Sequence, residues 1–498
     1  MKMSQLDWVA KWAVYSPQSI VANELESRRA WTYQELDQKA TAFVHWVRDR
    51  WQLKLGDRIA VLAENCLEYY LLFVAAQRAG YILAPLNYRL TASELDYLLQ
   101  DADPQLLIYS QAFAPKVAAI PSASSIKGRL ELENLLAALD GVIKQPLEPV
   151  NISETAPVFI LYTSGTTGFP KGVCYTHEML FWNSVNTSLS LVINSDSRTV
   201  NCMPPFHTGG WNVLSTPFIH HGAFSCIAKK FDADQILQSL ETERVTIFMG
   251  VPTMLKMMAD SPLFVSVDLS ALLYIIVGGE AMPVPLIERW HAKGVPIRQG
   301  YGMTEVGPNL TSLHQRDAVK KAGSIGRPNF YTQARIVDKS GQDVEVGDAG
   351  ELWLGGILVT PGYWRQPEAT ARTIQDGWLR TGDRVRADEE GYLYIVDRIK
   401  NMYISGGENV YPAEVERVLL QHAAVAEVAV VACPDERWGE VGRAYVVLAT
   451  TTASVERQLR DHCRAQLAKF KVPKYYVFLE ELPKNDSGKI DRKKLKAP

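Results

Sequence analysis

Much of the chain alternates between apolar runs of strand length and segments with helical periodicity, and this alternation restricts the fold more than any other feature. Strand-like runs occur at 58–62, 81–84, 106–109, 245–249, 272–277 and 296–299. Helix-like segments follow or separate them at 68–79, at 93–101, from about 252 and from about 283. Such alternation predicts parallel sheets covered by helices, and therefore an α/β fold.

The pattern changes twice toward the C-terminus. Residues 334–396 contain short strand-like runs between turns, which predicts a small antiparallel subdomain. Beyond 397–400 the helix-like and strand-like segments follow an α+β order. We therefore expect a large N-terminal domain of stacked α/β sheets with the antiparallel subdomain, over residues 1–397, and a smaller α+β domain over 401–498.

The composition of the chain excludes several classes of protein. Its 498 residues carry 52 basic and 55 acidic side chains, a net charge of −3 that gives no support for a nucleic-acid partner. Six scattered cysteines without a CxxC pair favour a reducing compartment over a disulfide or zinc framework. Asp7 and Lys11 interrupt the N-terminal apolar residues, and no apolar run approaches the roughly 18 residues of a membrane span. These features predict a cytoplasmic protein without a transmembrane segment. Peripheral membrane contact, and the choice between monomer and homodimer, stay open.

One loop carries the pattern of a phosphate-binding segment. After the apolar run 158–161 the chain reads Tyr-Thr-Ser-Gly-Thr-Thr-Gly-Phe-Pro-Lys-Gly over 162–172, and a helix with Thr176 as its N-cap is expected next. Glycines let the backbone approach an anion, hydroxyls donate to it, and Lys171 adds positive charge. The loop is not a Walker motif, because Gly172 follows Lys171 where Ser or Thr would be needed.

Five later stretches contain candidate functional residues, each with an ordinary structural alternative. They are His207 in Pro-Pro-Phe-His-Thr-Gly-Gly-Trp, the glycine turn at 278–281, Tyr-Gly-Met-Thr-Glu at 301–305, Arg-Thr-Gly-Asp at 380–383, and Lys489 in Asn-Asp-Ser-Gly-Lys. Alone, His207 is more often a packed or surface histidine, Asp383 a turn residue, and Lys489 part of a basic tail. Glu305 suits Mg²⁺, which takes one or two carboxylates together with substrate phosphates.

Taken together, the order of these motifs and their residue sequences closely resemble those of the adenylate-forming superfamily. The matching segments are Thr-Ser-Gly-Thr-Thr-Gly-Phe-Pro-Lys-Gly, Tyr-Gly-Met-Thr-Glu, Arg-Thr-Gly-Asp, Asp-Arg-Ile-Lys and Asn-Asp-Ser-Gly-Lys. The resemblance covers nearly the whole chain. Within the superfamily, the chain resembles the branch of the acyl- and aryl-CoA synthetases. It implies an enzyme that uses ATP and Mg²⁺ to convert a carboxylic acid to an acyl-adenylate with release of pyrophosphate. The acyl group then passes to the cosubstrate CoA, and AMP is released.

The resemblance also implies roles for individual residues in the first half-reaction. The β- and γ-phosphates would be held by Thr163, Ser164, Gly165, Thr166, Thr167, Gly168 and Lys171. The adenosine would be held by Gly279, Glu280, Ala281, Tyr301, Gly302, Asp383 and Arg398. The catalytic set would be His207, Thr304 at the α-phosphate, Glu305 on Mg²⁺, and Lys489 bridging the carboxylate and the α-phosphate.

For the second half-reaction the resemblance implies a mobile C-terminal domain that rotates about a hinge at 398–400, with Lys400 at the hinge position. Ser405, Gly406 and Gly407 would guide the pantetheine of CoA, and Trp438 would lie at its nucleotide. The acyl pocket would be lined by His207, Trp211, Asn212, Gly278 and Gly302, with the tryptophan and histidine either narrowing the cavity or gating it. The acid is expected to be fatty, of medium to long chain, or aromatic.

The sequence also bears on alternative functions. An amino-acid adenylation domain is disfavoured because His207 stands where such domains place an aspartate for the substrate ammonium. An acyl-AMP ligase that loads a carrier protein stays open, although the insertion frequent in that group is missing. A non-catalytic nucleotide-binding homologue is disfavoured because Glu305, Asp383 and Lys489 are all present.

Overall fold

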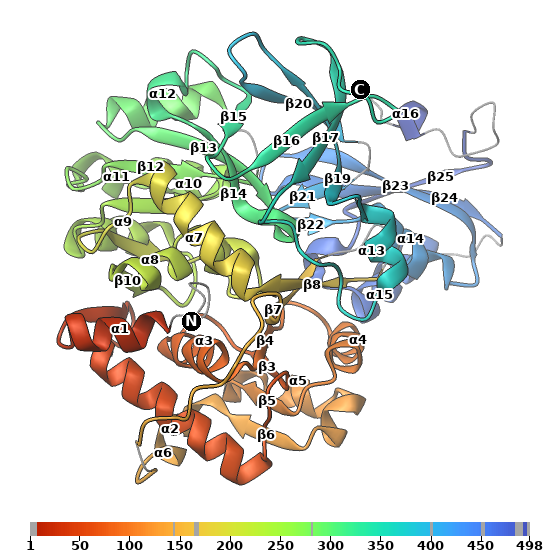
Figure 1. Cartoon of the computed structure of the whole chain (residues 1–498). Coiled ribbons are helices and arrows are strands. Elements are labelled where there is room, and N and C mark those ends of the chain that lie inside the picture. Colours follow the sequence, from red (N-terminus) through yellow and green to blue (C-terminus); the bar gives the residue numbers. More distant parts are fainter. Residues whose placement is uncertain are drawn as a thin grey trace. The chain divides into compact units, whose positions relative to one another are not determined.

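The computed structural model of the chain, drawn in Figure 1, describes residues 7–142, 145–163, 169–279, 282–398, 402–449, 454–483 and 492–495. By their internal contacts the residues divide into two compact units. The first unit takes Met1–Tyr88, Leu99–Tyr162 and Gly172–Asp397, and the second takes Arg89–Leu98, Thr163–Lys171 and Arg398–Pro498.

The first sheet has six strands in the order β6-β5-β3-β4-β7-β8. Their bounds are β3 (Arg58–Leu62), β4 (Ile82–Pro85), β5 (Leu106–Tyr109), β6 (Gly128–Glu131), β7 (Pro157–Thr163) and β8 (Lys171–Thr176). Strand β3 is parallel to both β4 and β5, with Ile59 opposite Leu83 and Leu106. These central strands are buried apolar runs, as parallel strands covered on both faces must be.

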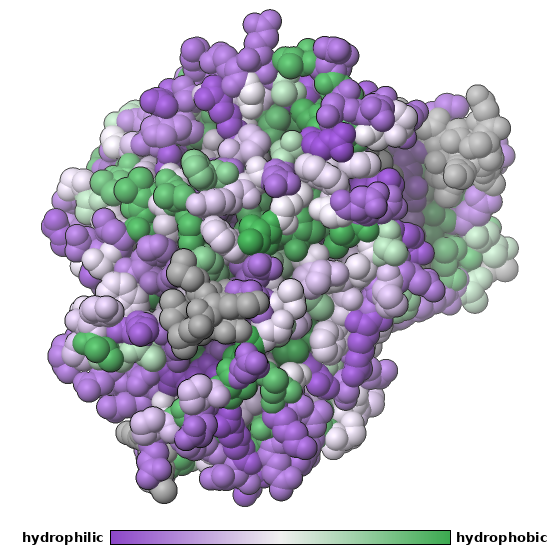
Figure 2. Space-filling view, viewed as in Figure 1, coloured by the Kyte–Doolittle hydropathy of each residue, from purple (hydrophilic) through white to green (hydrophobic). Residues whose placement is uncertain are grey.

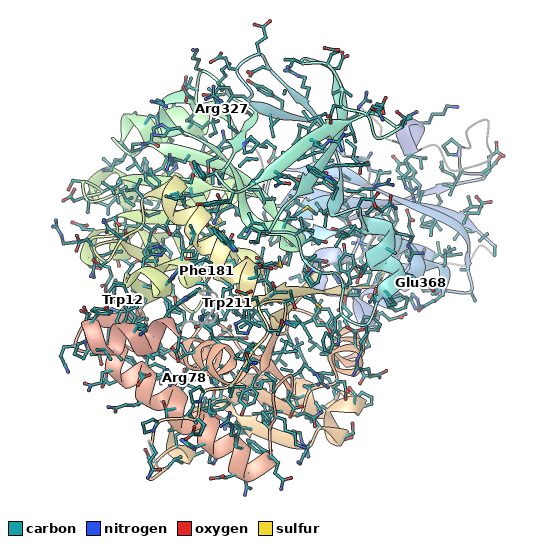
Figure 3. The ribbon with its side chains drawn as sticks, in the orientation of Figure 1. Trp12, Arg78, Phe181, Trp211, Arg327 and Glu368 are labelled. Atoms are coloured by element: carbon teal, nitrogen blue, oxygen red, sulfur yellow. The ribbon has the colours of Figure 1, made fainter. Side chains whose placement is uncertain are left out.

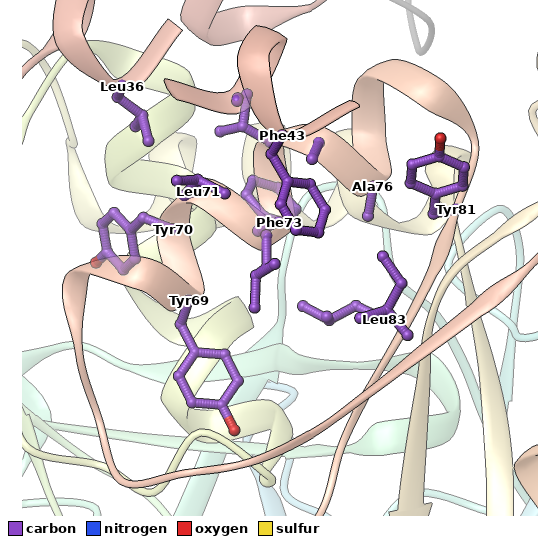
Figure 4. Packing of buried hydrophobic residues seen from close by; sticks show 14 of the residues in the cluster. Leu36, Phe43, Tyr69, Tyr70, Leu71, Phe73, Ala76, Tyr81 and Leu83 are labelled. Carbon is purple, nitrogen blue, oxygen red and sulfur yellow. The ribbon is translucent and has the colours of Figure 1, made fainter. Parts of the chain in front are cut away.

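Several helices accompany this sheet in the sequence. They are α1 (Trp8–Tyr15), α2 (Tyr33–Trp51), α3 (Leu67–Ala79), α4 (Ala92–Ala102), α5 (Ala114–Ala118) and α6 (Leu135–Ala138). Helix α2 begins with a capping box, in which Thr32 accepts from the Glu35 amide and Glu35 accepts from the Thr32 amide. Nearly every residue of α3 is buried, because most of its residues are apolar and pack among the side chains of α2 and the sheet (Figure 4).

A second, four-stranded sheet has the order β2-β1-β10-β9. It contains β1 (Ile20–Glu24), β2 (Ala30–Thr32), β9 (Arg198–Asn201) and β10 (Phe224–Ile227). The helices of this part of the chain are α7 (His177–Leu191), α8 (Ser215–His221), α9 (Ala233–Thr242), α10 (Pro252–Asp260), α11 (Leu263–Ser266) and α12 (Val284–Ala292). The predicted cap of α7 is confirmed, since the Thr176 side chain accepts from the Met179 amide at 3.1 Å.

The largest sheet has ten strands in the order β11-β12-β13-β14-β15-β20-β19-β17-β16, with β18 paired to β19. Its strands are β11 (Ile247–Gly250), β12 (Tyr274–Val277), β13 (Ile297–Met303), β14 (Gly307–Leu313), β15 (Ser324–Pro328), β16 (Gln333–Val337), β17 (Ala349–Gly355), β18 (Ile374–Gln375), β19 (Trp378–Ala387) and β20 (Leu393–Arg398), and α13 (Pro367–Thr373) precedes β18. The first three strands are parallel, and antiparallel pairing begins where β13 meets β14. The antiparallel strands therefore continue the parallel sheet through β14 and β15.

The second unit contains a five-stranded sheet and its helices. The sheet order is β22-β21-β24-β23, with β25 paired to β24. The elements are β21 (Tyr403–Ser405), β22 (Glu408–Val410), β23 (Val425–Asp435), β24 (Gly439–Leu448), β25 (Tyr475–Leu479), α14 (Pro412–Leu420), α15 (Val455–Gln466) and α16 (Arg492–Leu495). Val415 and Leu419 of α14 and Leu459 of α15 are buried against the sheet. The predicted fold class, a large α/β part followed by a smaller α+β part, is confirmed; the hinge and the limits of the domains stay predictions.

Short helical turns complete the described backbone. They are η2 (Gln111–Phe113), η3 (Pro121–Ser125), η4 (Leu132–Asn134), the π-helical η5 (Gly209–Val213), η6 (Thr304–Val306), η7 (Gln315–Asp317) and η8 (Lys469–Lys471). Polar residues cover most of the face shown in Figure 2, with apolar residues in separate small areas. Across the part of the chain that the structure describes, each helix is too short or too polar to cross a membrane.

Candidate active site

The candidate phosphate loop connects β7 to β8. Thr163 is the last residue of β7 and Lys171 the first of β8, and the Thr163 hydroxyl lies 3.5 Å from the Lys171 carbonyl oxygen. The loop residues Ser164, Gly165, Thr166, Thr167 and Gly168 lie outside the described residues. Beyond them, the ring of Phe169 packs on Tyr97, whose hydroxyl lies 3.4 Å from the Pro170 carbonyl oxygen.

Strand β7 is fixed just before the loop by a tyrosine. The Tyr162 hydroxyl donates to the Asp101 carboxylate at 2.7 Å. Burial raises the pKa of Asp101, while the hydroxyl of Tyr162 and the charge of Arg365 oppose that rise. The strand that leads into the loop therefore has a defined position in the first unit.

Two of the candidate adenosine residues, Tyr301 near the end of β13 and Asp383 within β19, contact each other directly. The Tyr301 hydroxyl donates to Asp383 Oδ2 at 2.7 Å, although the two residues are 82 positions apart in the sequence. The Asp383 amide in turn donates to the Thr381 hydroxyl at 3.0 Å. The Tyr301 ring and the Asp383 carboxylate are thus held side by side. These are the two groups expected to bind the adenine ring and the ribose hydroxyls of the nucleotide.

Glycines shape the backbone around the candidate adenosine residues. A β-carbon built on Gly302 would lie 2.1 Å from the Pro308 carbonyl oxygen, so only glycine allows β13 and β14 to meet there. Gly279, after β12, has a φ of +86°, which also favours glycine. Glu280 and Ala281 lie outside the described residues, and the next amide, that of Met282, donates to Gln299 Oε1 at 2.9 Å.

Glu305, the candidate metal ligand, lies in η6 directly after Thr304. Its side chain is buried, and its Oε1 accepts a hydrogen bond from the Tyr363 hydroxyl at 2.9 Å. Its backbone carbonyl accepts from the Thr360 amide at 2.8 Å. One buried carboxylate, together with the hydroxyl of the preceding Thr304, offers hard oxygen donors, which fit Mg²⁺ bound mainly through nucleotide phosphates.

The segment expected to line the acyl pocket differs in its burial from residue to residue. The Trp211 indole, labelled in Figure 3, is 2% exposed and donates to the Pro205 carbonyl at 2.7 Å. Its ring packs on Phe73 and Phe159 in the core. The Asn212 amide donates to the Thr208 hydroxyl at 3.2 Å, and its oxygen accepts from Thr216 at 3.0 Å. His207 is less buried, and its ring contacts Phe206.

Glycines and methionines gather near this segment. A β-carbon built on Gly209 would lie 3.8 Å from the methyl groups of both Met203 and Met249. One built on Gly278 would lie 4.0 Å from the Met249 methyl and 3.8 Å from the Gly300 carbonyl. Flexible methionine side chains beside glycines form an adaptable apolar surface.

In the second unit the predicted CoA residues lie together. Gly406 and Gly407 form the turn between β21, which ends at Ser405, and β22, with φ angles of +59° and +82°. The Gly406 amide donates to the Trp438 carbonyl at 2.8 Å, and a β-carbon on Gly406 would lie 2.7 Å from the Trp438 ring. The Arg437 guanidinium lies 5.0 Å from the centre of that ring. Lys400, Lys489 and the side chain of Arg398 lie outside the described parts.

Four residues that contact the candidate site residues or their neighbours in the sequence were not predicted. They are Gln299, Glu351, Thr360 and Tyr363. Glu351 accepts from the Gly382 amide at 3.0 Å and so holds strand β19 directly before Asp383, where the pairing of β17 with β19 is irregular. The signal for Tyr363 was weak, a Pro-Gly turn followed by two aromatic residues at 361–364.

Comparison with known proteins gives this geometry its context. The family model described as AMP-binding enzyme matches residues 9–364, and that of the AMP-binding enzyme C-terminal domain matches residues 414–489. A feruloyl-CoA synthase of Amycolatopsis sp is 38% identical over 484 residues, 97% of this chain and 96% of its own. A long-chain-fatty-acid–CoA ligase of Mycobacterium tuberculosis is 37% identical over 440 residues, 87% of this chain and 86% of its own.

Solved structures agree with these matches. The o-succinylbenzoate CoA synthetase of Bacillus subtilis, bound to a product analogue, superimposes with a TM-score of 0.89 at 31% identity, covering 99% of this chain and 98% of that one. A structure of the same enzyme with ATP and magnesium gives a TM-score of 0.73 at 30% identity, covering 99% of each chain. The chain belongs to the AMP-binding enzyme family, in its acyl- and aryl-CoA ligase branch. The expected resemblance is therefore confirmed.

Proposed function

We propose that the protein is an ATP-dependent, AMP-forming ligase that joins a carboxylic acid to the thiol of CoA. The observation that supports this most is the hydrogen bond between Tyr301 and Asp383, with Glu305 four residues beyond Tyr301. The bond holds the ring proposed for adenine beside the carboxylate proposed for ribose, and the carboxylate proposed for the metal follows on the same segment of the chain.

In the proposed first step a carboxylate oxygen of the acid attacks the α-phosphorus of ATP. The new acyl–phosphate bond forms as the bond between the α- and β-phosphates breaks, and pyrophosphate leaves. When bound, Mg²⁺ would neutralise charge on the phosphate oxygens. Glu305 would hold that ion, Thr304 would contact the α-phosphate, and Thr163 and Lys171 would bind the departing phosphates.

In the proposed second step the CoA thiolate attacks the acyl carbonyl. The new carbon–sulfur bond forms as the carbon–oxygen bond to AMP breaks, and AMP leaves. Ser405, Gly406 and Gly407 would guide the pantetheine arm, because glycines with positive φ leave room for a ligand beside the backbone. Trp438, 42% exposed and flanked by Arg437, would contact the nucleotide of CoA.

The acid is proposed to be aromatic or fatty. The names of the relatives include feruloyl-CoA, indoleacetate and long-chain-fatty-acid ligases. His207, Gly278 and Gly302, together with Met203 and Met249, would bound the acyl group. The burial of Trp211 argues against its acting as a gate, because swinging its ring aside would break its packing on Phe73 and Phe159.

A panel of aromatic and fatty acids, assayed for AMP formation with and without CoA, tests the proposal. We expect AMP formation that requires ATP, Mg²⁺, CoA and one class of acid. AMP formation that requires a carrier protein in place of CoA would instead support the carrier-loading alternative. Absence of AMP with every acid would contradict both functions.

Lys489→Ala separates the two half-reactions. The proposed bridging role predicts that acyl-adenylate formation falls about 10²–10³-fold, as for other preorganised charge-stabilising groups. Thioester formation from a supplied acyl-adenylate should be largely retained, because that step does not involve the triphosphate. Equal loss of both activities would contradict the role assigned to Lys489.

A further inference from the structure

The segment 360–364 pairs through its backbone with strand β8 in the first unit. Val173 and Tyr363 form an antiparallel bridge. On either side of it the Cys174 amide donates to the Gly362 carbonyl at 3.1 Å, and the Trp364 amide donates to the Gly172 carbonyl at 2.7 Å. The segment is thus bound to the strand that follows the candidate phosphate loop.

The same segment also binds Glu305, at both its backbone and its side chain. The Thr360 amide donates to the Glu305 carbonyl at 2.8 Å, and the Tyr363 hydroxyl donates to Glu305 Oε1 at 2.9 Å. The Thr360 hydroxyl donates to the Cys174 carbonyl at 2.7 Å. Residues 360–364 therefore connect β8 to the candidate metal ligand through a continuous set of hydrogen bonds.

Local packing holds the tyrosine in place. The Tyr363 side chain clusters with Val173 and Ala369, and its amide donates to the Thr370 hydroxyl at 2.9 Å. Gly362 has a φ of +142°, and a β-carbon there would lie 2.4 Å from a carbon of Thr370. Only glycine permits this tight turn, so the direction of the Tyr363 ring is set by the fold.

A carboxylate that accepts a bond from a buried, fixed hydroxyl loses rotational freedom before its ligand arrives. A hydrogen bond to a charged acceptor is among the stronger kinds, and partners of this sort orient metal ligands. Provided that the proposed function holds, we propose that Tyr363 is a positioning residue that orients the Glu305 carboxylate toward Mg²⁺ of the bound MgATP, with Thr360 fixing the Glu305 backbone to β8.

Tyr363→Phe tests this proposal, because it removes the hydroxyl and keeps the ring. Tyr392→Phe is the matched control: the Tyr392 hydroxyl donates to the Asp317 carboxylate at 2.9 Å, and neither residue belongs to the candidate site. ATP binding is titrated calorimetrically with saturating Mg²⁺ and with EDTA. The Mg²⁺ concentration that gives half-maximal adenylate formation is measured alongside.

We expect Tyr363→Phe to reduce the gain in ATP affinity produced by Mg²⁺ by about 10-fold, within the range typical of partners that orient metal ligands. Binding in EDTA should not change, and the half-maximal Mg²⁺ concentration should rise by a similar factor. Tyr392→Phe should behave as the wild type in both assays. A Tyr363→Phe protein with an unchanged Mg²⁺ effect on ATP binding would overturn the proposal.

A double-mutant cycle distinguishes positioning from a general effect on the fold. In a Glu305→Ala background the ligand atoms are gone, so Tyr363→Phe should cause no further loss of the Mg²⁺ effect. An equal loss in both backgrounds would mean that Tyr363 acts through stability, and would overturn the proposal. The binding titration does not require turnover, so failure to find a substrate acid would count against the proposed function alone.

Discussion

At the scale of single residues, the Tyr301–Asp383 pair shows what the sequence predicts and what only the folded structure shows. Both residues stand in motifs that the sequence makes visible, but their contact joins positions 82 apart. Only the folded sheet, in which β13 and β19 belong to one set of strands, brings them together. The hydrogen bond between them fixes the tyrosine ring relative to the carboxylate before a nucleotide binds.

Tyr301→Phe removes that bond while leaving a ring to stack on adenine. We expect KM for ATP to rise by roughly 5- to 10-fold, consistent with loss of about 1 kcal/mol from one hydrogen bond. Tyr301→Ala, which also removes the ring, should raise it further. Steady-state kinetics with varied ATP measures both, and a Tyr301→Phe enzyme with unaltered KM would show that the bond does not organise the site.

At the scale of strands and helices, much of the architecture could be predicted. The runs at 58–62 and 106–109 coincide with β3 and β5, and the helix-like segment at 68–79 corresponds to α3 (Leu67–Ala79). Local periodicity and capping are enough for this, because they depend on neighbouring residues. The union of parallel and antiparallel strands in one sheet could not be predicted, since it depends on pairings such as β15 with β20.

The same limit explains which site residues were missed. The glycine-rich loop and the motifs near Tyr301 and Asp383 have unusual local composition, so they could be recognised. Tyr363 and Glu351 look like ordinary strand and turn residues, and their contacts with Glu305 and Gly382 cross long stretches of sequence. Long-range hydrogen bonds of this kind leave no periodic signal.

The β13–β14 hairpin offers a test at this scale. Gly302→Ala would place a methyl group 2.1 Å from the Pro308 carbonyl, so the strands must separate, and we expect a loss of about 1–3 kcal/mol in the free energy of unfolding. Gly278→Ala is the control: its methyl group meets no atom closer than 3.8 Å, so stability should change by less than about 0.5 kcal/mol. Urea denaturation followed by circular dichroism would compare them, and equal stability of the two variants would contradict the packing described.

At the scale of the whole molecule, buried histidines should make stability depend on pH. Burial lowers the pKa of His177 to about 4, and burial with the nearby His221 lowers that of His220 to about 3. His220 stacks on Trp8 with ring centres 4.1 Å apart and lies 2.8 Å from the Ser184 hydroxyl, so it joins α1, α7 and α8. Both histidines are therefore neutral in the folded protein over a range in which the unfolded chain is protonated.

Because the unfolded state binds more protons below its histidine pKa of about 6.5, the free energy of unfolding should fall as pH decreases from there toward 4. Each of the two histidines should lower the free energy of unfolding at pH 5 by about 2 kcal/mol relative to its value at pH 7.5. Urea midpoints measured across this range test the prediction. His220→Gln should flatten the dependence, and a wild-type midpoint that does not change between pH 7.5 and 5 would contradict it.

The central claim is that the acid is activated as an acyl-adenylate before it reaches CoA, and isotope transfer tests it most directly. The acid found active in the panel is labelled with ¹⁸O in its carboxylate and incubated with MgATP and CoA. Attack of the carboxylate on the α-phosphorus, followed by cleavage of the carbon–oxygen bond, predicts AMP carrying one ¹⁸O and an acyl-CoA retaining the other. Unlabelled AMP, or ADP and phosphate in place of AMP and pyrophosphate, would contradict the account.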